Sequence, residues 1–177
     1  MRCLALIVAL SALASSALAA PLPPPIAPAS SGKVQCYAPD RARKTCRSIA
    51  VFRDSLDGGV EEPSTVLISP DPVITMQTVS PVTIKNSQVC GFVRPEDISE
   101  ATFSVGGVAA TPEQSQSFRA KITAMFNNGV FGHEICTSFV PDGDGLIAKV
   151  SIDGVVQPKM DQSVIWVSPS EGYHVGT

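Results

Sequence analysis

Histidine is scarce in this sequence, which has only His133 and His174 among its 177 residues. A serine–histidine–aspartate device would have to be assembled from distant segments. No G-x-S-x-G nucleophile elbow occurs, and Thr137 stands where the H-E-x-x-H pattern begun by His133-Glu134 needs its second histidine. We therefore expect a non-catalytic protein without metal or cofactor. The alternative is an enzyme with dispersed residues, involving His133, Glu134 and His174.

Positive charge is not in excess either, because 13 lysines and arginines stand against 16 aspartates and glutamates, a formal net charge of −3. Binding to nucleic acid in general depends on many basic contacts to phosphates, so we expect no nucleic acid among the partners. Beyond Ala20 the sequence also lacks an apolar run near the roughly 20 residues that a membrane-spanning helix needs. We expect no transmembrane segment in the mature chain.

The N-terminus has the pattern of a cleavable secretory signal peptide. Arg2 supplies a positive charge, an apolar run follows from Cys3 to Leu13, and Ala17-Leu18-Ala19 places small side chains where a signal peptidase needs them. An uncleaved anchor or a buried helix is the alternative, but the prolines that follow would end such a helix. The pattern predicts a signal peptide over 1–19 and a periplasmic or secreted mature protein.

The next segment, residues 20–32, is rich in proline and poor in large apolar side chains. This composition favours an extended, polyproline-like conformation over packing. We expect a disordered tether over 20–32, followed by a single disulfide-stabilised β-rich domain over 33–177. The length of that domain is ordinary for one hydrophobic core.

Loss of the signal peptide would remove Cys3 and leave an even number of cysteines: Cys36, Cys46, Cys90 and Cys136. An even number in an oxidising compartment is typical of disulfides, and four cysteines allow three pairings. Zinc and redox sites usually contain a C-x-x-C pair, which this sequence lacks. We predict a Cys36–Cys46 disulfide, which closes a short loop, and a Cys90–Cys136 disulfide, which joins two strands.

Short β-branched runs separated by turn residues dominate the rest of the chain. Strands are expected at 66–68, 73–76, 82–84, 89–93 and 164–167. Gly106-Gly107 and Asp153-Gly154 each separate two further runs, and they predict hairpins over 102–110 and 147–156.

One amphipathic helix is expected over about 112–127. Thr111 and Gln114 form a capping box, and Pro112 suits the first helical position. Apolar side chains at 118, 122, 125 and 126 follow helical spacing and predict a face that docks onto a sheet. The elements together predict an α+β fold, with mainly antiparallel β-strands and hairpins and this helix packed on the sheet.

Basic side chains cluster around the first cysteine pair. From Lys33 to Arg53 there are six lysines and arginines and a single acidic residue, Asp40. Four of the six form what we call the basic loop: Arg41, Arg43, Lys44 and Arg47. The plain interpretation is neutralisation within the protein by the acidic residues that follow: Asp54, Asp57, Glu61 and Glu62.

The functional interpretation is a surface for an anionic partner such as anionic lipid, lipopolysaccharide or acidic glycan, with Tyr37 as a flat platform on which an arginine stacks. We therefore expect an exported, non-catalytic cell-envelope or secreted protein that binds such a partner through the basic loop. A hydrolase-like enzyme and a purely structural envelope component are the alternatives that the sequence leaves open.

Overall fold

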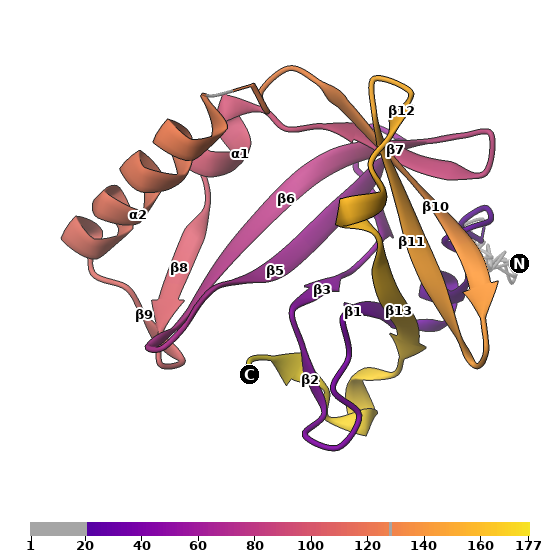
Figure 1. The fold of residues 1–177 in the computed structure, drawn as a ribbon, viewed down its shortest axis with the longest axis horizontal. Helices are drawn as coiled ribbons and strands as arrows, with labels where there is room; N and C mark the ends of the chain where they lie inside the picture. Colours follow the sequence, from indigo (N-terminus) through magenta and orange to yellow (C-terminus); the bar gives the residue numbers. More distant parts are fainter. Residues whose placement is uncertain (1–20, 128) are drawn as a thin grey trace, which may run out of the picture.

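The structure is a computed structural model that describes residues 21–127 and 129–177 (Figure 1). The predicted signal peptide, residues 1–19, lies outside the described residues. The strands are β1 (Val34–Tyr37), β2 (Thr45–Cys46), β3 (Ser48–Ala50), β4 (Arg53–Asp54), β5 (Val60–Pro70), β6 (Val73–Lys85), β7 (Gln88–Phe92), β8 (Thr102–Val105), β9 (Val108–Ala109), β10 (Glu134–Asp142), β11 (Gly145–Ile152), β12 (Val155–Val156), β13 (Gln162–Val167) and β14 (His174–Val175). The α-helices are α1 (Pro95–Ser99) and α2 (Pro112–Phe126), and 3-10 turns cover Ala27–Ser31, Pro158–Met160 and Pro169–Glu171.

Eight strands close into an antiparallel barrel. Around the barrel their order is β5, β3, β1, β13, β11, β10, β7 and β6, and the pairing of β6 with β5 completes the circle. Closure brings together segments from opposite ends of the chain, because Gln35 of β1 lies opposite Trp166 of β13. Successive side chains of a strand point to opposite faces, so alternate residues of each strand form the barrel interior.

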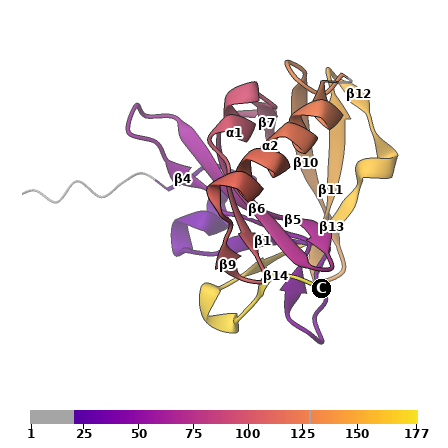
Figure 2. The same cartoon turned by 90° about the vertical axis from the view of Figure 1, so that its left-hand side faces the viewer.

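The predicted α+β fold with an amphipathic helix packed on the sheet is wrong. The chain is mostly β, and α2 is the one helix of seven or more residues in the described ranges. It lies at one side of the molecule, beside β8, and does not form a layer over the barrel (Figure 1, Figure 2). The physical reason is closure, because a sheet that curls on itself buries its apolar face without a helical layer.

The helix itself matches its predicted position to within one residue. The Thr111 side chain accepts a hydrogen bond from the Gln114 backbone N–H, and the Gln114 side chain accepts one from the Thr111 backbone N–H. Ile122 is the one buried residue of α2, in a small cluster with Met76 and Phe103. Met125, expected on the docking face, is 59% exposed.

Within the described residues, none of the helices has the length and hydropathy of a membrane-spanning segment.

Both predicted hairpins are confirmed. β8 and β9 turn at Gly106-Gly107, and β11 and β12 turn at Asp153-Gly154; in each turn both residues have positive φ, as a type I′ turn requires. β6 is longer than expected, since the runs at 73–76 and 82–84 belong to one continuous strand. One end of β6 pairs with β7 in the barrel, and the other end pairs with β8 beside the helices.

The structure contains the two disulfides expected from the sequence. Cys36–Cys46 connects β1 to β2 on the outer side of the barrel, where it packs with Ile165. Cys90 and Cys136 lie directly opposite each other on β7 and β10, so their disulfide ties two neighbouring barrel strands.

Residues 21–32 do not form the expected tether. Leu22 and Ile26 are 8% and 0% exposed, and they pack with Phe52, Val82 and Val89. These contacts close one end of the barrel with apolar side chains. The segment packs in spite of its many prolines because Leu22 and Ile26 are large enough to fill that end of the core.

Candidate functional site: a cavity inside the barrel

The inner face of the barrel is polar along one section of the β5–β6 pair. Glu62 of β5 lies opposite Ser80 of β6, and Ser64 lies opposite Thr78. Side chains directly opposite in an antiparallel pair share a face, and this face is the one that lines the barrel interior. Glu61 faces the other way, where its carboxylate pairs with Arg53 at 3.1 Å.

A cavity of about 230 Å³ opens at this section. Five barrel strands contribute to its wall, mainly from their inner faces, and Val93 after β7 completes it. The lining residues are Tyr37, Glu62, Ser64, Ser80, Val82, Val89, Gly91, Phe92, Val93, Ile135 and Thr137. Val82 and Val89 also belong to the apolar cluster around Leu22 and Ile26. The cavity is therefore next to the apolar cluster that closes one end of the barrel.

Glu62 is the chemically unusual residue of the cavity. The Glu62 side chain is half-buried, and its carboxyl group forms no hydrogen bond or ion pair within residues 21–127 and 129–177. Burial raises the pKa of Glu62 from 4.5 to about 7, because a low-dielectric surrounding disfavours the charged form. At neutral pH the barrel therefore contains a carboxyl group that is divided between its charged and neutral forms.

Tyr37 and Gln35 fix the neighbouring part of the wall. The Tyr37 hydroxyl donates a hydrogen bond to Gln35 Oε1 at 2.8 Å, and Gln35 itself is 0% exposed. Burial, and secondly the nearby charge of Glu62, raise the pKa of Tyr37 well above its usual value. Tyr37 is therefore a neutral phenol whose hydroxyl proton is already used in the hydrogen bond to Gln35. Only the lone pairs of its oxygen remain to accept a hydrogen bond from a ligand.

The cavity lining contains one group in the pKa range of acid–base chemistry, surrounded by hydroxyl and apolar side chains. A carboxyl group with a pKa near 7 is in the range of a general acid or base, but Tyr37 is the other titratable residue of the lining and stays protonated. The lining hydroxyls of Ser64, Ser80 and Thr137 have no histidine or lysine beside them in this wall to activate a nucleophile. A polar group set among apolar side chains is typical of a ligand pocket.

The basic loop lies apart from this cavity: three of its residues are between β1 and β2, and Arg47 directly follows β2. Arg41 forms an ion pair with Asp144 at 2.8 Å, Arg43 pairs with Asp40 at 2.7 Å, and Lys44 donates to the Glu171 backbone carbonyl. The partners of Arg41 and Arg43 are thus not the acidic stretch named from the sequence. All four basic-loop residues are exposed, and binding of an anionic partner there stays a prediction. Tyr37 lies in the barrel wall and is not a platform for these arginines.

The residues of the enzyme alternative are not brought together. His133 Nδ1 contacts Asp153 Oδ2 at 2.5 Å in the β11–β12 turn, while the Glu134 side chain forms an ion pair with Lys85. His174 is on β14, which pairs with β2 on the opposite side of the fold from that turn. Nothing in the described ranges joins the three into one site.

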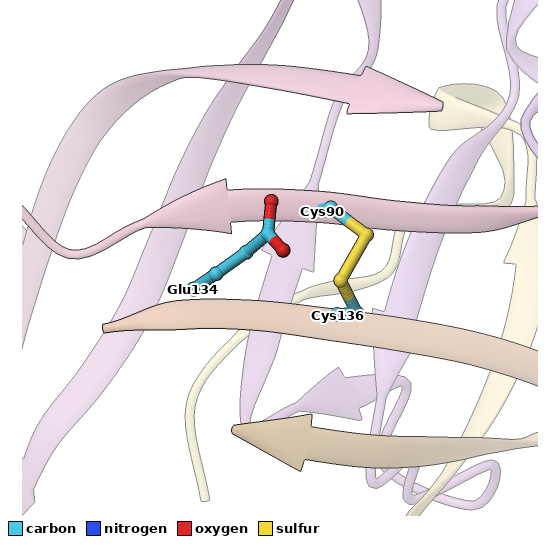
Figure 3. A group of neighbouring side chains, drawn as sticks. All are labelled: Cys90, Glu134 and Cys136. Atoms are coloured by element: carbon cyan, nitrogen blue, oxygen red, sulfur yellow. A yellow bond between two sulfur atoms is a disulfide. The ribbon is translucent and has the colours of Figure 1, made fainter. Parts of the chain in front are cut away.

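Cys90, Cys136 and Glu134 form a cluster on the outer face of the barrel (Figure 3). Their sulfur and carboxylate atoms all lie within 4.8 Å of one another. A thiolate, not a disulfide sulfur, is the metal ligand that cysteine supplies, and here both sulfurs are bonded to each other. With Glu134 also held by Lys85, this cluster does not offer a metal centre in the oxidised protein.

Sequence reasoning placed Glu62 on the surface, as a partner for basic residues. The signal that could have found it is the alternation Val60-x-Glu62-x-Ser64-x-Val66, which puts all four side chains on one face of a strand. Pro63 and the adjacent Glu61 obscured this pattern, because proline and paired charges are typical of loops.

Comparisons of the chain with family models, with curated proteins and with solved structures find no match.

Proposed function

We propose that this chain is an exported, non-catalytic binding protein that holds a small organic ligand in its barrel cavity. The observation that carries the proposal is the unpartnered carboxyl group of Glu62 inside the barrel. A carboxyl group that is partly removed from water without a partner is costly to ionise, and a group with a strongly perturbed pKa in a cavity is a candidate for a functional site.

The size of the cavity limits the ligand. Drug-sized ligands occupy roughly 300–1,000 Å³, and this cavity holds about 230 Å³. A cavity of about 230 Å³ is smaller than this range, so we expect a ligand of fragment size. Val82, Val89 and Ile135 offer it an apolar wall, and the hydroxyl groups offer polar contacts.

Export is the second part of the proposal. It is supported by the signal pattern of residues 1–19 and by two disulfides, which persist in oxidising compartments. Mass spectrometry of the native protein tests it directly: a mature chain that begins at Ala20 is expected, and a retained Met1 would contradict export. A mature chain of this length keeps Leu22 and Ile26, which close the barrel.

The test of binding uses two variants of β6. One fills the cavity with a larger side chain, and the other places the same side chain on the opposite face of the strand as a control. Ser80→Phe places an aromatic ring in the cavity, whereas Thr83→Phe places it on the outer, exposed side of β6. Ligand-observed NMR with a mixture of small cationic, neutral and anionic fragments supplies the readout. We expect fragments that bind wild type and Thr83→Phe but not Ser80→Phe. No bound fragment, or hits that Ser80→Phe retains, would overturn the proposal.

A further inference from the structure

We propose that the cavity is specific for a protonated primary amine carried on a short apolar group. This inference rests on the proposed function and names the class of ligand. Its basis is geometric: the cavity wall contains one carboxyl group, several oxygen acceptors and no cation.

The charge distribution favours a cation. The nearest basic residue in sequence, Arg53, is on the outer face and is already paired with Glu61. In the described part of the chain, no lysine, arginine or histidine pairs with Glu62. A bound ammonium ion would supply the missing counter-charge where water is partly excluded and charges interact more strongly. An anionic ligand would meet repulsion from the same carboxylate.

The hydrogen-bonding groups also favour a donor-rich ligand. An ammonium ion has three N–H donors and no acceptor, so it needs several oxygen atoms around it. Ser80 lies directly opposite Glu62, and the Ser80 and Thr137 hydroxyls form no hydrogen bond within the described residues. The Tyr37 hydroxyl has already donated its proton to Gln35 and offers only lone pairs.

The apolar side of the cavity accounts for the rest of the ligand. Val82, Val89 and Ile135 lie on the inner faces of β6, β7 and β10. They would cover a short alkyl or aryl group, which gains free energy in proportion to the apolar area removed from water. The cavity therefore combines an anionic, acceptor-rich site with an apolar wall, as recognition of an alkylamine or arylalkylamine requires.

The experiment compares two matched pairs of probes by isothermal titration calorimetry: benzylamine with benzyl alcohol, and n-butylamine with n-butanol. Each pair has one skeleton and differs in charge. We expect wild type at pH 8 to bind at least one amine about tenfold or more tighter than its alcohol, as a charge-assisted hydrogen bond provides. Glu62→Gln should lose this preference. Glu61→Gln, which changes the adjacent outward-facing carboxylate, should keep it.

The pH dependence adds an independent readout. With a Glu62 pKa of about 7, the ionised fraction falls about tenfold from pH 8 to pH 6, so amine affinity should fall by about the same factor. Alcohol binding should change little. Glu62→Gln should show no such pH dependence.

The outcomes separate this inference from the proposed function. Equal binding of amine and alcohol by wild type, or amine binding that Glu62→Gln retains, overturns specificity for amines while leaving a ligand cavity. If wild type binds no amine but binds other fragments that Ser80→Phe does not bind, specificity for amines is overturned and the ligand cavity is not. Absence of every cavity-dependent fragment overturns both.

Discussion

Replacing Glu62 with glutamine should make the protein more stable at pH 8, and should change its stability much less at pH 5. The cause is the pKa of Glu62, which burial raises from 4.5 to about 7. A group that binds its proton more tightly in the folded state stabilises the fold at low pH, and this stabilisation is lost as pH rises between the two pKa values. The difference between 4.5 and about 7 corresponds to about 3 kcal/mol.

The assay is urea denaturation of wild type and Glu62→Gln at pH 5, 6, 7 and 8. The free energy of unfolding of Glu62→Gln minus that of wild type should grow by about 2.5 kcal/mol from pH 5 to pH 8. Contributions of other titrating groups cancel in the difference. Glu61→Gln is the control, because it loses an exposed ion pair worth about 0–1 kcal/mol without this pH dependence. Parallel curves for wild type and Glu62→Gln would refute the placement of Glu62 in a desolvated cavity.

Three further predictions concern the rest of the fold. Ile26→Ala should lower the free energy of unfolding by about 2–5 kcal/mol, measured by chemical denaturation, and a loss below about 1 kcal/mol would show that the N-terminal segment does not close the barrel. Replacing Cys90 and Cys136 together by alanine should cost about 4 kcal/mol by the chain-entropy relation for a separation of 46 residues; an unchanged denaturation midpoint would contradict this. The triple alanine variant at positions 41, 43 and 44 should lose salt-sensitive binding to anionic lipid vesicles or acidic glycans, and the basic-loop prediction fails if wild type does not bind or if the variant binds equally well.

Features encoded locally could be predicted from the sequence. The capping box at Thr111 and Gln114 predicted the start of α2, and the Gly106-Gly107 and Asp153-Gly154 pairs predicted two hairpins. The structure contains the two disulfides that spacing and the redox argument suggested. Each of these features depends on a short stretch of chain or on the cysteines alone.

Closure of the barrel is different, because it depends on pairings between distant segments. Nothing in the sequence near Gln35 indicates that it lies opposite Trp166. Without that pairing the sequence predicts antiparallel strands and hairpins with an amphipathic helix packed on the sheet, whereas the closed barrel buries its apolar face without α2. The same error hid the site, since Glu62 faces inward only when β5 is part of a closed wall.

The most direct test of the account is the titration of the Glu62 carboxyl carbon by ¹³C NMR, with Glu62→Gln used to assign its signal. We predict a Glu62 pKa of about 7 in the free protein and a lower pKa when benzylamine is present, because a bound cation favours the carboxylate. A pKa near 4.5 in the free protein, the ordinary value for glutamate, would contradict the claim that the barrel holds an unpartnered carboxyl group for a ligand.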